Sequence, residues 1–274
     1  MKKIFAMMMF AAAALVACEK GGDDQTPEDP NTLTYAGVTY KTVTLSNGQT
    51  WMAEPLRFVP EGLTVSDDPK SGHVWYPYEV KDGTPTALKD AESIAKLGYI
   101  YDAAAAFGVD AITPDNFNTF EGTQGICPEG WHLPTRADFL ATFGYATKNT
   151  EETSDPENKD AVFYTEENKG GSCVKADESG FNVTFTGAIT AGAYSKLVID
   201  DSVCNVEAYK GANRMNYFIG STPYKLETND NGSIKKAQYY AGMTTFTKVY
   251  LTGRLTAAYC AYNFGGQVRC VKNK

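Results

Sequence analysis

The stretch GICPEGWHLPT, residues 125–135, constrains the fold most strongly because it determines where one helix begins. Thr135 can accept a hydrogen bond from a free backbone N–H at a helix start, and Asp138, three residues later, can return the contact. This pair approximates a capping box, with Asp in the place of the usual Glu. The next residues supply an apolar helix face: Phe139, Leu140 and Phe143. We therefore interpret Trp-His-Leu-Pro as the approach to a helix, with Trp131 and Leu133 beneath it.

His132 lies inside this approach, where a catalytic role has to be weighed. A catalytic histidine works with a nucleophile and an orienting group within hydrogen-bond reach. Its neighbours Leu133 and Pro134 supply neither. We expect a buried histidine that donates a hydrogen bond to a backbone carbonyl ahead of the helix. The opposing hypothesis, an enzyme that uses His132, stays open at this point.

The first 18 residues, MKKIFAMMMFAAAALVAC, are typical of an exported protein. Lys2 and Lys3 precede an apolar run, residues 4–17, that is too short to cross a bilayer core of about 30 Å as a helix. The Leu-Val-Ala-Cys that ends at Cys18 resembles a bacterial lipobox, which implies cleavage before Cys18 and a diacylglycerol on its sulfur. We expect residues 1–17 to be a signal peptide and the membrane to be a partner through this N-terminal lipid. An ordinary secreted protein is the alternative.

An acidic segment without aromatic residues follows, EKGGDDQTPEDPN at residues 19–31. Such a composition cannot bury enough apolar surface to fold, so we expect residues 18–31 to be a lipidated, solvated tether. An acidic run directly after a lipidated cysteine also resembles the surface-export signal of some Gram-negative lipoproteins, although plain tethers are often acidic too. We expect a lipid-anchored protein of the cell outer membrane, exposed at the surface, with residues 32–274 as its folded domain.

The charge balance argues against nucleic acid as a partner. The formal net charge is −8, and loss of Lys2 and Lys3 with the signal peptide makes the mature chain more acidic. The folded part has no basic run longer than Lys235-Lys236. A chain without a basic stripe is poorly suited to nucleic acid or to an anionic lipid surface.

Five cysteines follow Cys18: Cys127, Cys173, Cys204, Cys260 and Cys270. Export would place them where disulfides persist, and the odd number leaves at least one thiol free or bonded elsewhere. No two have C-x-x-C spacing, and the chain has 2 histidines, His73 and His132. These features argue against a structural zinc site. We expect no metal and no other cofactor.

The rest of the chain reads as short strands and short helices. The Asn47-Gly48 turn predicts a hairpin with Trp51 and Met52 on its return strand. Residues 60–85, rich in Pro, Gly and Asp, predict a long loop around an aromatic patch. Two further helices are predicted, one within residues 86–98 and one between Asp102 and Gly108.

The second half of the chain predicts mainly strands. Residues 147–172 are mostly polar and indicate a surface excursion. Strand-like segments separated by Gly, Asn and Asp then continue to the end of the sequence: 181–189, 215–222, 237–243, 247–253 and 266–272.

Three landmarks in this order resemble one family. They are GQTWMAEPLRF (48–58), YIYDAAAAFG followed by CPEGWHLPTRADF (99–108 and 127–139), and VRCVK (268–272). The chain resembles the Fibrobacter succinogenes major paralogous (FISUMP) domain across essentially all of residues 33–274. Pro55 replaces the family's Asn, Asp102 stands where Trp is common, and Ile219-Gly220 replaces an aromatic-Ser pair. These departures weaken the transfer of a shared ligand site more than the transfer of the fold.

The resemblance implies an α+β fold of the C-type-lectin-like kind. Two helices, beginning near Asp102 and at Thr135, would pack on twisted antiparallel sheets, with the N- and C-terminal strands adjacent. Cys127 and Cys270 lie in the two most family-like blocks, so a structural disulfide between them is expected. For the other cysteines we favour a Cys173–Cys204 pair with Cys260 unpaired. Calcium-dependent sugar binding lacks support, because the Glu-Pro-Asn and Trp-Asn-Asp signatures are absent.

Aromatic clusters supply the candidate binding residues. Tyrosine and tryptophan present rigid apolar faces with polar tips, which suits glycan or protein surfaces. The candidates are Trp75, Tyr76, Tyr78, Tyr217 and Tyr224. A core filled with aromatic side chains is the alternative. Asp201-Ser202-Val203 also resembles a bacterial O-glycosylation sequon, which makes Ser202 a candidate modification site.

These observations predict a surface lipoprotein that binds a glycan or a cell-surface protein and is not an enzyme. One alternative is an enzyme that resembles formylglycine-generating oxidases, or another activity that uses His132 or a free cysteine such as Cys260 or Cys270. A second alternative is a structural or tip subunit of a surface fimbria.

Overall fold

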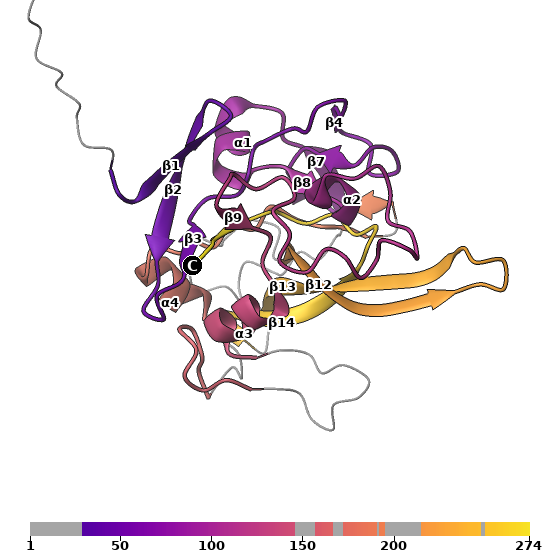
Figure 1. Cartoon of the computed structure of the whole chain (residues 1–274). Helices are drawn as coiled ribbons and strands as arrows, with labels where there is room; N and C mark the ends of the chain where they lie inside the picture. The colour runs from indigo at the N-terminus through magenta and orange to yellow at the C-terminus, as the bar shows by residue number, and fades with distance from the viewer. Residues whose placement is uncertain (1–28, 146–156, 167–171, 191, 195–214, 248–249) are drawn as a thin grey trace, which may run out of the picture. The chain divides into compact units, whose positions relative to one another are not determined.

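Strands from the two ends of the sequence share one antiparallel sheet (Figure 1). The computed structural model describes residues 29–145, 157–166, 172–190, 192–194, 215–247 and 250–274. The sheet has the order β1-β2-β3-β15-β9, in which the strands are β1 (Thr32–Tyr35), β2 (Val38–Thr44), β3 (Thr50–Met52), β15 (Val271–Lys272) and β9 (Trp131–His132). Asn47-Gly48 forms the predicted turn, and Val43 pairs with Trp51 across it. The C-terminal strand therefore shares a sheet with the N-terminal strands, and its neighbour among them is β3 rather than β1.

A second antiparallel sheet contains the longest strands. Its order is β12-β13-β14, in which the strands are β12 (Met215–Thr228), β13 (Ile234–Thr247) and β14 (Tyr250–Ala261). The last pair between β13 and β14 is Gln238 with Ala261. Beyond it, β12 and β13 continue as a two-stranded hairpin that projects past β14 (Figure 1).

Short strands occupy the region predicted to be a long loop, so that prediction is wrong in part. β4 (Val65–Ser66) and β5 (Val74–Trp75) pair in parallel, β8 (Ile100–Tyr101) pairs antiparallel with β5, and β6 (Tyr78–Lys81) pairs with β7 (Thr84–Ala87). A further pair joins β10 (Ile189–Thr190) and β11 (Ala193–Tyr194). The pairing of β5 with β8 joins segments that local turn composition does not connect, whereas β6 and β7 form a local hairpin around Asp82-Gly83.

The described residues contain four helices, and each begins at a residue whose side chain caps it. α1 (Ala91–Leu97), α2 (Ala103–Phe107) and α3 (Arg136–Phe143) begin after Asp90, Asp102 and Thr135. The capping box of Thr135 and Asp138 is complete. α4 (Cys173–Glu178), capped by Ser172, lies between the predicted excursion 147–172 and the first predicted strand 181–189, where no helix was predicted.

Two buried clusters form most of the core. One gathers around Trp51 and the α3 rings, with members that include Phe139, Phe143, Phe181 and Phe218. The other holds the alanines of α2 with Met52, Phe107 and Tyr239. Trp131 and Leu133 are buried as expected, but they belong to the second cluster rather than to the cluster that contains Phe139.

A buried arginine explains why residues 181–189 form no strand before Ile189, contrary to prediction. Arg269 is fully buried, and its guanidinium donates to the carbonyl oxygens of Phe181 (2.5 Å) and Asn182 (2.6 Å). Its Nε donates to Oε1 of Gln267 at 2.9 Å. Because side chains satisfy these carbonyl groups, the segment needs no neighbouring strand for that purpose.

The described part of the chain is thus an α+β fold dominated by short and long antiparallel strands. Residues 31–274 form one compact unit. None of the helices among the described residues is long and apolar enough to cross a membrane.

Candidate functional site

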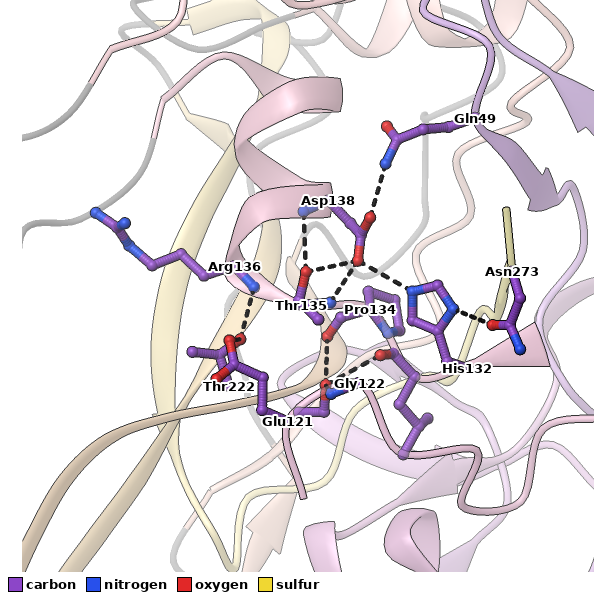
Figure 2. Close-up of polar contacts among 12 residues, drawn as sticks. Gln49, Glu121, Gly122, His132, Pro134, Thr135, Arg136, Asp138, Thr222 and Asn273 are labelled. Carbon is purple, nitrogen blue, oxygen red and sulfur yellow. Dashed lines mark hydrogen bonds and ion pairs between the residues drawn. The ribbon is translucent and has the colours of Figure 1, made fainter. Parts of the chain in front are cut away.

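A polar pocket of about 280 Å³ lies beside the Trp-His-Leu-Pro approach. The β2–β3 turn, β9, the start of α3 and residues 271–274 line it. Its central side chains are Gln49, His132, Asp138 and Asn273, which point toward one another in Figure 2. These side chains come from four separate parts of the sequence.

Asp138 is the hub of the hydrogen-bond network in this pocket. Its Oδ2 accepts hydrogen bonds from the backbone N of Thr135 (2.8 Å), from Thr135 Oγ1 (2.6 Å) and from His132 Nε2 (3.2 Å). Its Oδ1 accepts from Gln49 Nε2 at 2.7 Å (Figure 2). One carboxylate therefore joins the helix cap, the β2–β3 hairpin and β9.

His132 links Asp138 to the segment that follows β15. Its Nδ1 lies 2.7 Å from Oδ1 of Asn273, just after β15. Both ring nitrogens face oxygen acceptors, an arrangement that a doubly protonated imidazolium satisfies fully. The hydrogen bond to Asp138 accordingly raises the pKa of His132, against the opposing effect of burial. Burial raises the pKa of Asp138, but hydrogen bonds from His132 and Thr135 outweigh it and leave that pKa lowered.

This geometry corrects one expectation about His132. Its partners are a carboxylate and an amide rather than a backbone carbonyl. Sequence reasoning assigned Asp138 to the helix cap and missed that the same carboxylate reaches His132, and it missed Asn273 altogether. The capping pattern was the available signal for Asp138. No local signal marked Asn273, which lies 141 residues from His132.

Two hydroxyl groups of β12 attach that strand to the same helix start. Ser221 Oγ lies 3.1 Å from the carbonyl oxygen of Pro134 and donates to it. Thr222 Oγ1 accepts from the backbone N of Arg136 (2.9 Å) and donates to Oε1 of Glu121 (3.0 Å) (Figure 2). The start of α3 is therefore held by hydrogen bonds to β12 as well as by those within its own cap.

The second histidine forms a similar pair at a different helix. His73 Nδ1 lies 2.6 Å from Oδ2 of Asp102, whose Oδ1 accepts from the backbone N of Ala105. The His73 side chain is 45% exposed, whereas that of Asp102 is 10% exposed. Burial raises the pKa of Asp102 more than its hydrogen bonds lower it.

The cysteines are placed as follows. Cys127 and Cys270, the pair expected from the sequence, form a disulfide. Cys260 is free and buried, and burial raises its pKa to about 12. The side chain of Cys173 and all of Cys204 lie outside the described residues, as do Cys18 and Ser202. Within the described part of the chain, no three His, Cys, Asp or Glu side chains gather as a metal site would require.

Two of the five candidate binding residues are corrected by the structure. Trp75 is 4% exposed and Tyr78 is 1% exposed, so both belong to the core rather than to a ligand platform. The remaining three are partly exposed but have different ring neighbours: Tyr76 contacts Tyr99, Tyr217 contacts Phe264, and Tyr224 contacts Tyr240. The core alternative therefore holds for part of the set.

Comparison with known families identifies the chain. The model of the Fibrobacter succinogenes major domain family matches residues 46–272. The chain belongs to this family. The matched span includes the disulfide, His132, Asp138 and the buried Arg269, whereas Asn273, the other partner of His132, lies one residue beyond it. No curated protein and no solved structure matches the chain.

Proposed function

We propose that this chain is a lipoprotein of the cell outer membrane, anchored through a diacylglycerol on Cys18 and exposed at the surface. The lipobox-like residues that end at Cys18 and the acidic segment 19–31 support this proposal. Residues 1–17 would be removed as a signal peptide, and residues 18–31 would act as the tether.

The folded part, residues 32–274, recognises a glycan or a cell-surface protein and does not catalyse a reaction. The observation that carries this proposal is the state of the thiols. Cys270 is bonded to Cys127, and Cys260 is buried with its pKa raised to about 12, so neither presents a thiolate at neutral pH. Both nitrogens of His132 are also engaged by side chains of the fold.

A C-type-lectin-like architecture is the fold we propose for this domain. Adjacency of the terminal strands in one sheet supports it. The packing of the α3 residues Phe139 and Phe143 on Trp51 of β3 also supports it, as does the bridge that links Cys127 to Cys270.

The test has two parts. Alkylation of the folded, unreduced full chain followed by peptide mapping should recover Cys127 and Cys270 as one linked peptide and Cys260 unlabelled. A labelled Cys270 or Cys260 would favour the redox alternative. Protease shaving of intact cells should release the domain from the wild type, and Cys18→Ala should release it from the membrane fraction.

Binding itself is tested with the purified full chain in detergent. Immobilised polysaccharides and immobilised surface glycoproteins, the latter with and without enzymatic deglycosylation, serve as probes. Saturable binding to either class is expected. If the chain binds none of these probes, the proposed recognition function is wrong.

A further inference from the structure

Trp75 and Tyr78 are buried, and other residues form the surface that covers them. Three partly exposed tyrosines, Tyr76, Tyr99 and Tyr194, surround an exposed ion pair between Asp67 and Lys89. We call these five residues the tyrosine patch. None of them except Tyr76 was singled out as a binding residue in the sequence, because the five residues lie at five separate places along the chain.

Side-chain contacts join the patch into one surface. The Tyr76 and Tyr99 ring centroids are 6.1 Å apart, and the Lys89 ammonium lies 5.7 Å from the centroid of Tyr76. Lys89 pairs with the carboxylate of Asp67, and the hydroxyl of Tyr194 donates to the backbone carbonyl of Asp67 at 3.0 Å. The side chains of Asp67 and Lys89 are 56% and 54% exposed, so a ligand can reach both.

Buried residues hold the patch in place. The indole N–H of Trp75 donates to the carbonyl oxygens of Asp68 (3.0 Å) and Ser71 (2.9 Å), which fixes the loop that carries Asp67. Tyr78 donates its hydroxyl to the carbonyl oxygen of Ala188, and its ring lies 4.3 Å from that of Tyr194. A surface ordered before binding loses less entropy when a ligand arrives.

We propose that the tyrosine patch binds a neutral glycan. The apolar C–H face of a pyranose ring packs on a tyrosine ring, while the carboxylate of Asp67 accepts from one hydroxyl group and the ammonium of Lys89 donates to its neighbour. The two charges cancel locally, so the patch favours neither an acidic nor a basic sugar. The acidic net charge of the chain further disfavours anionic glycans. This inference rests on the proposed recognition function and assigns it a place and a ligand class.

The experiment is a glycan array probed with the full chain in detergent, followed by calorimetric titration of the tightest neutral oligosaccharide. Neutral hexose oligomers should dominate the binders. Tyr76→Ala should weaken binding by about tenfold or more, as loss of a central aromatic contact does. Tyr76→Phe should stay within about threefold, because it keeps the ring.

Tyr35→Ala is the matched control, since Tyr35 is another partly exposed tyrosine with an aromatic ring neighbour, Phe58, and lies on β1. It should bind like the wild type. The proposal is wrong if Tyr76→Ala binds the glycan as tightly as the wild type while keeping the same melting temperature. It is also wrong if the chain prefers acidic glycans. Binding to deglycosylated protein without any glycan binding would also overturn it, yet would leave the recognition function intact.

Discussion

Both histidines of the chain pair with an aspartate that caps a helix, yet the two carboxyl groups are perturbed in opposite directions. The pKa of Asp138 is lowered and that of Asp102 is raised. Both carboxylates are largely buried, with 16% and 10% of the side chain exposed. Burial by itself therefore does not explain the difference.

The number of donors separates the two pairs. Four hydrogen bonds with side-chain or backbone donors converge on Asp138, and one of the donors is a histidine that a second acceptor holds protonated. Asp102 has fewer donors: His73, the backbone N of Ala105 and, as the weakest of its contacts, the backbone N of Ala104. A charged group is stabilised in the interior when enough donors replace its lost water, and it is penalised when they do not. The ionised carboxylate thus stabilises the fold at Asp138 and costs stability at Asp102.

The largest effect is expected from alanine at the two aspartates. Asp138→Ala should lower the free energy of unfolding by about 3 kcal/mol, because it removes a cap and leaves the donors of Gln49 and His132 without their acceptor. Asp102→Ala should lower it by about 1 kcal/mol, because loss of the α2 cap is partly offset by removal of a poorly solvated charge. Urea denaturation of the disulfide-intact chain measures both. Equal losses of the free energy of unfolding in the two alanine variants would contradict the difference proposed between Asp138 and Asp102.

A smaller and sharper effect is expected from asparagine, which keeps the shape and the capping oxygen. Asp138→Asn should still cost about 1.5 kcal/mol, since it removes a charge that His132 and Thr135 stabilise. Asp102→Asn should change the free energy of unfolding by about 0.5 kcal/mol or less, and in either direction. A large loss at Asp102 with little change at Asp138 would contradict our assignment of the two environments.

The smallest effect is expected in the pH dependence of stability. Because the pKa of His132 is raised in the folded chain, its stabilisation is complete below about pH 6.5 and is lost as pH rises through the folded value. Asp138 stabilises the fold above about pH 3.8, and this stabilisation is lost as pH falls through its lowered pKa. Asp102 has the opposite effect: stability is lost as pH rises from its unfolded pKa through its raised folded pKa. Melting temperatures across pH 3–8 for the wild type, His132→Gln and His73→Gln test this. The fall in melting temperature above about pH 6.5 should become smaller in His132→Gln. If that fall persists in His132→Gln and disappears in His73→Gln, His73 rather than His132 is the histidine responsible.

The sequence predicted those parts of the molecule that depend on neighbours a few residues away. The caps at Asp102 and Thr135 and the turn at Asn47-Gly48 follow local rules, and each is present. Family resemblance added the Cys127–Cys270 pairing, which local patterns leave undetermined.

The failures share a dependence on distant contacts. Near the start of residues 181–189, Arg269 takes the carbonyl groups of Phe181 and Asn182, and β5 within residues 60–85 pairs with the later β8. The hairpin of β6 and β7 is the exception, since its two strands are neighbours in the sequence. The candidate site shows the same limit, since Asn273 reaches His132 from the far end of the sequence. Trp75 and Tyr78 were assigned to the surface because aromatic residues look alike in a sequence whether they are buried or exposed.

The position of β15 has a consequence for how the molecule is made. Residues 271–272 lie between β3 and β9, so two strands that are synthesised early have no common neighbour until almost the whole chain has left the ribosome. The five-stranded sheet is therefore completed only after β15 has been synthesised, so β9 and β3 stay unlinked through most of the synthesis of the domain.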